Sequence, residues 1–267
     1  MGNSSRFIIL RVRLNALLRN HNLNPKAKSP KCSKAHPLCD ADDGNSRMTD
    51  AAPSTIAVMR IGAIGHRPNR LPARETRRIE RQCHEMIRAI CEAATASGHA
   101  PALHIISALA EGSDRIIAEV GLALGASLEC LLPFAASEYA RDFASAKSRA
   151  TFQTLLTRAS SVMELAGRRD DEGAAYEAVG RAVLERADVL IAVWNGDDAA
   201  GRGGTAQMVA EASARHLPII WIHAAKNVSP MLLGGPPEAR TPRPIDLLRS
   251  WLSTGARPRP NGKKSGC

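Results

Sequence analysis

Aromatic residues are scarce in this sequence: they make up 3% of its 267 residues, although 44% of the residues are hydrophobic. Leucine, isoleucine, valine and alanine must therefore fill most of the core. Such aliphatic side chains are typical of a parallel sheet that is covered by helices on both faces. The composition thus favours an α/β fold.

Long apolar runs are also missing, and none approaches the ~20 residues that a membrane-spanning helix needs. The segment Phe7–Leu18 is apolar but is interrupted by two arginines and an asparagine, and no signal-peptide cleavage pattern follows it. We therefore expect a cytoplasmic protein without a membrane contact. The segment is either a short amphipathic basic helix or the result of a start codon assigned too early, since Met48 directly precedes the first predicted strand.

The six cysteines lack the paired spacing of a metal site. Cys32, His36 and Cys39 lie close together in the sequence, but no second pair of ligands accompanies them. The other cysteines are scattered, and three fall in helical or strand patterns where a small buried side chain fits. We expect reduced thiols and no metal.

Acidic residues are absent from residues 1–39, which carry eight lysines or arginines, and residues 224–267 carry eight basic and two acidic residues. Residues 48–223 carry 19 basic and 21 acidic residues, so the net charge of +10 resides in the two ends of the chain. We predict a basic, disordered leader at 1–47, a near-neutral domain at 48–223 and a Gly/Pro/Arg-rich extension at 224–267. The ends are either solvated tails or weak nucleic-acid contacts.

From Ile56 onward, short apolar runs alternate with helical patterns, as in βαβ units. The predicted strands are Ile56–Ile64, Leu103–Ser107, Ser127–Leu132, Val162–Leu165, Val189–Trp194 and Ile219–His223. The predicted helices are Pro72–Ser97, Ser113–Leu124, a broken one over Ser137–Ala159, Asp171–Arg186, Thr205–Arg215 and a short one at Pro244–Leu252. Right-handed crossovers arrange these elements as a three-layer, doubly wound, Rossmann-like sheet of about six mainly parallel strands. Such sheets bind ligands at the carboxyl ends of the strands, where the strand order reverses.

The loop after the first predicted strand combines glycine with cationic side chains. Its candidate ligand-binding residues are Gly65, His66, Arg67, Asn69 and Arg70. Glycine permits close approach of the backbone, arginine offers a planar donor fork for phosphate, and the loop leads into a helix N-terminus. The alternative is a solvated turn whose arginines pair with Glu75 or Glu80.

The loop after the second predicted strand carries Glu111, Gly112, Ser113 and Asp114, of which Gly112 and Ser113 are candidate ligand-binding residues. Ser113 or Asp114 could cap the helix that begins there. Capping does not explain Glu111, and a carboxylate at the end of a buried strand suits a ribose diol or acid–base catalysis. Glu111 and Asp114 are therefore the candidate catalytic residues, and an exposed glutamate without a role is the alternative.

A glycine-rich loop follows the fifth predicted strand. It contains Gly196, Arg202, Gly203, Gly204 and Thr205. Such an entry into a helix directs free backbone N–H groups and the positive end of the helix dipole at one point, which favours an anion. A purely structural turn is the alternative. Trp194 precedes this loop and either stacks on a base or closes the core.

At these loops the sequence resembles the Rossmann-like superfamily that unites the DNA-processing Smf proteins and the Lonely Guy phosphoribohydrolases. SALAEGSDRIIAEVGLALGASLECLLPF is similar to the Smf glycine loop, helix and strand, and GRGGTAQMV is similar to the Lonely Guy phosphate loop. GHRPNR, LPF…EYARDF, Tyr176-Glu177 and DVLIAVWNG resemble a largely uncharacterised bacterial branch. Over residues 56–223, this resemblance implies that Tyr139, Asp142 and Tyr176 help to line a nucleotide pocket.

The sequence departs from Lonely Guy enzymes at Gln207, a candidate ligand-binding residue, where those enzymes carry a catalytic glutamate. A glutamine cannot accept a proton, and the arginine and lysine signature of those enzymes is not evident. Glu211, one helical turn further on, either shares the face of Gln207 or is exposed or salt-bridged. The near-neutral domain also argues against the extended basic surface with which Smf proteins bind DNA.

We therefore expect a protein that binds a nucleotide or a nucleotide-derived small molecule as a sensor or ligand-handling module. The residues expected to hold or neutralise phosphate are Gly203, Gly204, Thr205, Arg67 and Arg70, with Glu111, Asp114 and Tyr176 at the sugar or base. One alternative is a hydrolase that cleaves an N-glycosidic or phosphate linkage, and another is an Smf-like protein that processes DNA. No firm cofactor is implied, and self-association is left open.

Overall fold

The computed structural model describes residues 58–95, 101–198 and 201–233. The predicted leader, its Cys32–Cys39 segment and the predicted helix at Pro244–Leu252 lie outside the described residues. Within the described part of the chain, no helix is long and apolar enough to cross a membrane, and no three His, Cys, Asp or Glu side chains are grouped as metal ligands.

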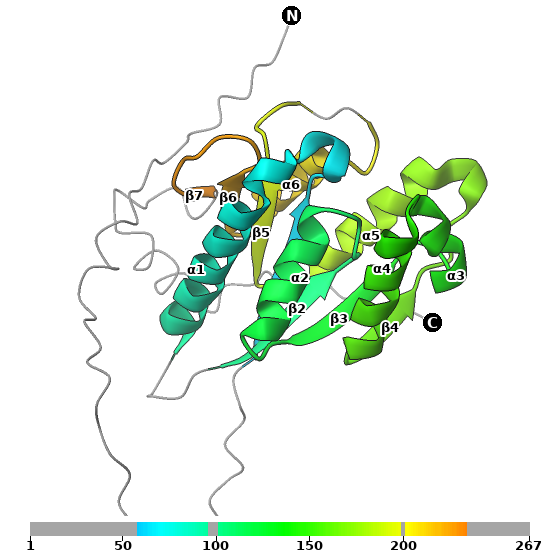
Figure 1. Cartoon of the computed structure of the whole chain (residues 1–267). Coiled ribbons are helices and arrows are strands. Elements are labelled where there is room, and N and C mark those ends of the chain that lie inside the picture. Colours follow the sequence, from blue (N-terminus) through cyan, green and yellow to red (C-terminus); the bar gives the residue numbers. More distant parts are fainter. Residues whose placement is uncertain (1–57, 96–100, 199–200, 234–267) are drawn as a thin grey trace, which may run out of the picture. The chain divides into compact units, whose positions relative to one another are not determined.

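A seven-stranded sheet with the order β4-β3-β2-β1-β5-β6-β7 forms the centre of the described residues (Figure 1). The strands are β1 (Val58–Gly65), β2 (Ala102–Ser107), β3 (Ser127–Leu132), β4 (Ser161–Glu164), β5 (Val189–Trp194), β6 (Ile219–His223) and β7 (Met231–Leu233). The strands β1 to β6 are parallel, whereas β7 pairs with β6 in the antiparallel direction.

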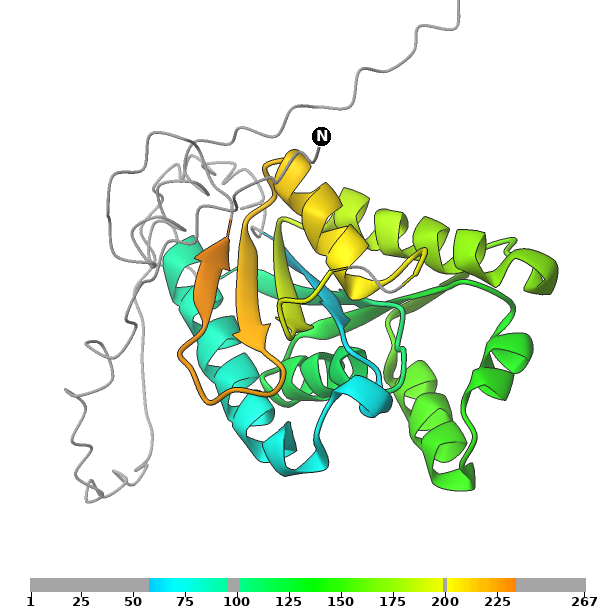
Figure 2. The same cartoon turned by 90° about the horizontal axis from the view of Figure 1, so that it is seen from above.

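Helices cover both faces of the sheet, which gives three layers (Figure 2). They are α1 (Thr76–Ala94), α2 (Ser113–Ala123), α3 (Ala136–Tyr139), α4 (Ala146–Arg158), α5 (Glu172–Arg186) and α6 (Thr205–Ala214). The helices α1, α2 and α4 lie on one face, and α5 and α6 pack together on the other. Each face has its own cluster of buried side chains.

The burial of each element follows its sequence pattern. In α1 the apolar residues recur at three- and four-residue spacing, and Ile79, Cys83, Ile87 and Ile90 are fully buried against the sheet. The central strand β5 is apolar from Val189 to Val193 and buried over that whole stretch, whereas every residue of the edge strand β4 is exposed. This difference is expected for a parallel sheet covered on both faces.

The fold class predicted from the sequence is confirmed. Three of the predicted strands have the bounds that the structure gives them, and the predicted break in the helix over Ser137–Ala159 separates α3 from α4. The predicted helix at Pro72–Ser97 is shorter, since a 3₁₀ turn at Ala73–Glu75 precedes α1. The strand β7 was not predicted, because its three residues carry no alternating pattern and it forms only through pairing with β6.

The order of the strands places a switch point between β1 and β5. From β1 the chain proceeds outward through β2 and β3 to the edge strand β4, and then returns to form β5 on the other side of β1. The carboxyl ends of β1 and β5, at Gly65 and Trp194, therefore diverge into loops that leave on opposite faces of the sheet. A doubly wound sheet binds its ligand in the crevice at this point.

Candidate functional site

A cavity of about 390 Å³ opens at the switch point between β1 and β5. Most of the predicted ligand-binding residues line it: Gly65, His66, Arg67, Asn69, Arg70, Tyr176, Trp194, Arg202, Gly203, Gly204 and Thr205, together with the candidate catalytic residue Asp114. The rest of the lining consists of Ala63 and Ile64 of β1, Ala108, Ala110, Tyr139, Asp198, Gly201 and residues of α5 and α6. Glu111, Gly112, Ser113, Gly196 and Gln207 are not among the lining residues.

Gly112 and Ser113 join the loop after β1 to the start of α2 rather than facing the cavity. The backbone N–H and the hydroxyl of Ser113 both donate to the carbonyl oxygen of His66, at 3.1 and 3.0 Å. A Cβ on Gly65 would lie 2.4 Å from that of Ser113, and Gly112 has a φ of +108° with no space for a side chain beside His66. Gly112 and Ser113 therefore hold the loop after β1 against the start of α2, and neither lines the cavity.

Asp114 is the carboxyl group that faces the cavity from this wall. Its side chain is buried and accepts hydrogen bonds from the backbone N–H groups of Gly65 and Ala110. Burial raises the pKa of Asp114 to about 7, against the opposing influence of Arg67. Near neutral pH this carboxyl group can therefore hold or release a proton inside the cavity. Of the two candidate catalytic residues, Asp114 lines the cavity, whereas Glu111 is half-buried outside its lining.

His66 and Trp194 form the part of the wall between β1 and β5. The imidazole Nε2 of His66 lies 2.8 Å from Oδ1 of Asn195, and burial lowers the pKa of His66, so that the ring is neutral near pH 7. The indole of Trp194 packs against Trp221 with ring centroids 5.5 Å apart. Gly196, with a φ of +89°, lies under Trp221, which makes it a turn residue rather than a ligand contact.

A cluster around Asp142 closes the side of the cavity next to α3. The buried carboxylate of Asp142 accepts a hydrogen bond from the hydroxyl of Tyr176 at 2.6 Å and from Arg169 at 2.6 Å, and Arg67 approaches it at 3.5 Å. The guanidinium of Arg67 also lies over the ring of Tyr176, 5.2 Å from its centroid.

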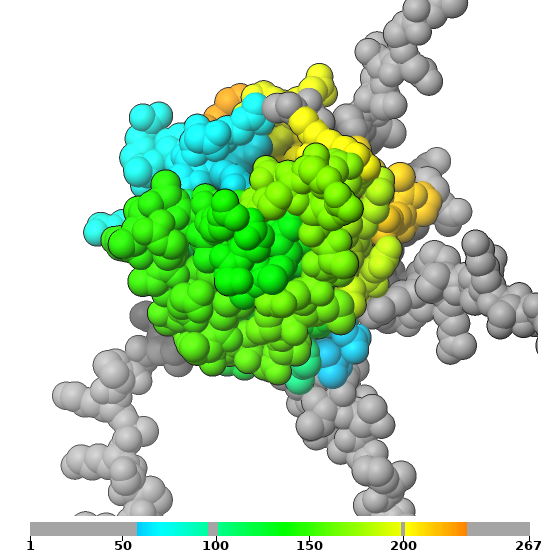
Figure 3. All heavy atoms as spheres, turned by 90° about the vertical axis from the view of Figure 1, so that its right-hand side faces the viewer, coloured from blue at the N-terminus to red at the C-terminus, as the bar shows by residue number. Residues whose placement is uncertain are grey.

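This cluster joins three segments that are distant in the sequence: the loop after β1, the turn after α3 and the start of α5 (Figure 3). Figure 3 shows the cyan residues after β1 beside the green and yellow-green residues of α3 to α5. The sequence does not identify Arg169 as a site residue, because it lies in a charged turn whose pattern is typical of solvent-exposed segments. Its contacts with Asp142 and with the ring of Phe134 exist only in the folded chain.

The glycine loop enters α6 through Gly203 and Gly204. Gly203 has a φ of +75°, and a Cβ there would lie 2.7 Å from the backbone nitrogen of Glu177, so only glycine fits. Gly204 is the N-cap residue of α6 and provides no side-chain cap for the first N–H groups of the helix. Thr205 and Ala206, at the beginning of α6, line the cavity. This end of α6 therefore presents uncapped backbone donors and its positive dipole to the cavity.

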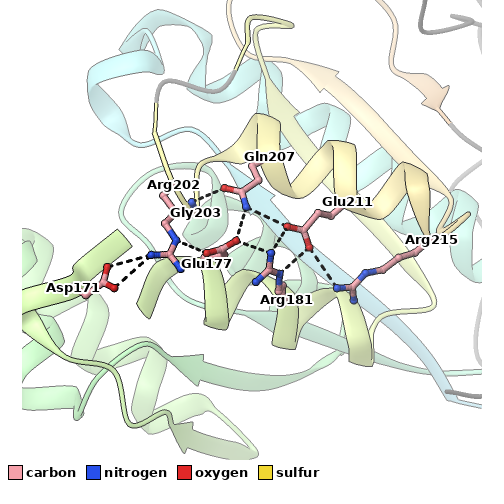
Figure 4. Close-up of polar contacts among 8 residues, drawn as sticks. All are labelled: Asp171, Glu177, Arg181, Arg202, Gly203, Gln207, Glu211 and Arg215. Atoms are coloured by element: carbon pink, nitrogen blue, oxygen red, sulfur yellow. Dashed lines mark hydrogen bonds and ion pairs between the residues drawn. The ribbon is translucent and has the colours of Figure 1, made fainter. Parts of the chain in front are cut away.

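Polar side chains of α5 and α6 hold the glycine loop in place (Figure 4). Oε1 of Gln207 accepts a hydrogen bond from the N–H of Gly203 at 2.8 Å, and Nε2 of Gln207 donates to Glu177 and Glu211. Arg202 pairs with Glu177 at 2.5 Å. Gln207, predicted to touch the ligand, thus contacts the loop instead, and Glu211 both shares its face and is salt-bridged to Arg181.

No family model and no curated protein sequence matches the chain. Among solved structures, the chain is similar to the X-ray structure of TM1055, with 14% identity and a TM-score of 0.37 over 61% of this chain and 72% of that one. It is similar to DNA processing protein A from Streptococcus pneumoniae, with 12% identity and a TM-score of 0.41 over 61% of this chain and 50% of that one. The chain thus matches half the length of the pneumococcal protein.

DNA processing protein A from Helicobacter pylori is also similar, with 15% identity and a TM-score of 0.40 over 64% of this chain and 68% of that one. That structure concerns the binding of single-stranded DNA by the Helicobacter protein. At these identities the likeness concerns the fold and transfers no activity to this chain.

Proposed function

We propose that this cavity binds a nucleotide or a nucleotide-derived small molecule. The observation that carries the proposal is the composition of the cavity at the switch point: the uncapped start of α6, three arginines, a tryptophan and a buried carboxyl group face one space. Each of these groups has a counterpart in a nucleotide, namely phosphate, base and sugar hydroxyls.

The phosphate would bind at the start of α6. Gly203 and Gly204 carry no side chains, so an anion can approach the N–H groups of the first helical turn closely. Arg67 and Arg70 line the same cavity and supply permanent positive charge. An anion that engages Arg67 competes with Asp142, which is held more closely by Arg169 and Tyr176.

The base and the sugar would occupy the remainder of the cavity. Trp194 offers a ring next to the glycine loop, and stacking on an aromatic ring accepts any base. Asp114 can accept a hydrogen bond from a sugar hydroxyl when it is ionised, or donate one when it is protonated. The polar groups therefore fit a ligand that carries both an anion and hydroxyl groups.

Asp114 also favours a second candidate function, hydrolysis of an N-glycosidic or phosphate linkage of the same ligand. A buried carboxyl group whose pKa lies near 7 is suited to proton transfer at neutral pH. In such a reaction Asp114 would take a proton from the attacking water or give one to the leaving group. Gln207 does not contribute, because its amide is bound to the loop and to two glutamates.

A thermal-shift screen of the full chain against nucleoside mono-, di- and cyclic phosphates and dinucleotides tests the proposal, because a ligand that binds the folded state raises the melting temperature. Every hit is examined by chromatography for breakdown. Arg67→Ala and Gly204→Val should abolish the shift, and Arg88→Ala, which removes an exposed arginine of α1, should preserve it.

The outcomes separate the candidate functions. A hit that remains intact supports a binding module, whereas conversion of the hit to free base or sugar phosphate supports the hydrolase. For the hydrolase, Asp114→Asn should abolish turnover while binding persists. If no nucleotide shifts the melting temperature, the nucleotide proposal is wrong. Salt-dependent DNA binding by the predicted basic ends, residues 1–47 and 224–267, would then be the function to test.

A further inference from the structure

The side chain of Gln207 makes three hydrogen bonds that only an amide can make together. Its oxygen accepts from the N–H of Gly203 at 2.8 Å. Its nitrogen donates to Oε1 of Glu177 at 2.8 Å and to Oε1 of Glu211 at 3.1 Å (Figure 4). An amide provides an acceptor and two donors, whereas a carboxylate only accepts. Gln207 therefore connects the glycine loop to two carboxylates, one on α5 and one on its own helix.

The charged side chains around Gln207 balance one another, so the position of Gln207 itself needs no charge. The charged side chains of this network are the carboxylates of Asp171, Glu177 and Glu211 and the guanidinium groups of Arg181, Arg202 and Arg215. Hydrogen bonds from arginines lower the pKa of Glu177, through Arg202, and the pKa of Glu211, through Arg181. Both glutamates are thus anionic at neutral pH, and the neutral amide lies between them.

The glycine loop depends on this arrangement. Gly203 has a φ of +75° and packs against the backbone of α5 at Glu177. The contact from Gln207 resembles a capping box, in which the third residue of a helix reaches back to a backbone N–H before it. Here the contact fixes Gly203, which precedes the N-cap residue Gly204. In the backbone that leads into the proposed phosphate site, the N–H of Gly203 is therefore held by the side chain of Gln207.

We propose that Gln207 is a positioning residue that holds the glycine loop in the conformation open to a ligand, and that a neutral amide is required there because Glu177 and Glu211 flank it. A glutamate at this position would add a fourth carboxylate to a network with three arginines. Near neutral pH this carboxylate would leave the loop, and it would return only at lower pH, once it has taken up a proton. The role of the loop in ligand binding rests on the proposed function, but its conformation does not.

Amide hydrogen exchange at Gly203 in the full-length protein tests this inference without a ligand. In Gln207→Glu, exchange at about pH 7.5 should be about tenfold faster than in the wild type, the effect of losing one hydrogen bond. At about pH 5, after correction for the intrinsic exchange rate, a protonated glutamate should restore protection to within about twofold of the wild type. Gln207→Leu should exchange rapidly at both pH values.

Gln153→Glu is the matched control, because it introduces the same charge on the exposed side of α4 and should change neither rate. If Gln207→Leu does not fold, the comparison of exchange rates of Gln207→Glu at the two pH values still tests the inference. Wild-type protection in Gln207→Glu at both pH values would overturn the inference. So would fast exchange that does not depend on pH.

Thermal shift with AMP, measured on the same variants, separates this inference from the proposed function. If the wild type binds AMP, Gln207→Glu should lose the shift at about pH 7.5 and regain it at about pH 5. If the wild type does not bind AMP or any other nucleotide, the proposed function fails, and the exchange rates alone determine whether Gln207 positions the loop.

Discussion

Two walls of the cavity contain glycines near the start of a helix: one is formed by β1 and α2, the other by α5 and α6. The contacts that hold these two walls in place differ. On the wall of β1 and α2, backbone groups and buried side chains interlock: Gly65 packs on Ser113, and the carbonyl of His66 accepts two hydrogen bonds from Ser113. On the wall of α5 and α6, the loop is held by Gln207 and by Arg202, whose side chain is 56% exposed. Exposed ion pairs contribute little to stability. The first wall should therefore be rigid, and the second should respond to charge.

The largest effect is expected at Gly65. A Cβ there would lie 2.4 Å from the Cβ of Ser113 and 2.9 Å from the carbonyl oxygen of Val193. Gly65→Ala should lower the free energy of unfolding by about 3 kcal/mol, since overpacked cores cost this much. The melting temperature should fall by roughly 6–12 °C. Gly201→Ala on the other wall, where a Cβ meets nothing within 4 Å, should change stability by less than about 0.5 kcal/mol. Equal losses of unfolding free energy in the two variants would show that the two walls do not differ in rigidity.

The second effect concerns pH and Asp114. Its carboxyl group keeps a proton up to about pH 7 in the folded state but ionises near pH 4 in the unfolded chain, so unfolding releases a proton between these values. Stability should therefore fall as the pH rises from about 4 to about 7. We expect a loss of about 2 kcal/mol, less than the full shift in pKa would give, because the surroundings of a buried charge reorganise.

Asp114→Asn removes the titrating group, so urea unfolding at several pH values should show a flatter profile for this variant than for the wild type. Glu111→Gln, which changes a half-buried carboxylate outside the cavity lining, should leave the profile of the wild type unaltered. Identical slopes for Asp114→Asn and the wild type would mean that Asp114 titrates as an ordinary exposed carboxyl group.

The smallest effect on global stability is expected at Arg202. Arg202→Ala removes the ion pairs with Glu177 and Asp171. The side chain of Arg202 is exposed, and the buried Glu177 keeps Arg181 and Gln207 as partners. The melting temperature should change by less than about 2 °C, as for the loss of surface ion pairs. Amide exchange in the segment 201–207 should nevertheless accelerate, since the loop loses one of its two side-chain contacts. A large drop in melting temperature would show that the second wall belongs to the rigid core.

The sequence predicts the sheet well, because its signals are local. The apolar run of β5 and the spacing of apolar residues in α1 are properties of neighbouring positions, and both elements form where they were expected. The glycine loops were also expected to lie together, since parallel strands bring their carboxyl ends to one edge of the sheet, and residues of both loops line one cavity. In contrast, β7 arises from pairing with β6 and has no local signal.

The roles of single site residues were harder to predict, because they depend on which way a side chain points. Glu111, in the loop before α2, and Asp114, in the first turn of α2, are three positions apart, and only the fold shows that Asp114 faces the cavity. Ser113 and Gln207 have side chains that suit a ligand, but both bind the backbone of a neighbouring loop. Arg169 reaches Asp142 across 27 residues, a contact that no motif encodes.

Calorimetric titration of a nucleoside monophosphate and of the corresponding nucleoside into the full-length protein tests the central claim most directly. If the start of α6 and Arg67 bind phosphate, the nucleotide should bind at least about tenfold more tightly than the nucleoside, as charge-assisted hydrogen bonds would give. Arg67→Ala should bring the two affinities together. Equal affinities of nucleotide and nucleoside in the wild type, or no binding of either, would contradict the assignment of this cavity as a nucleotide site.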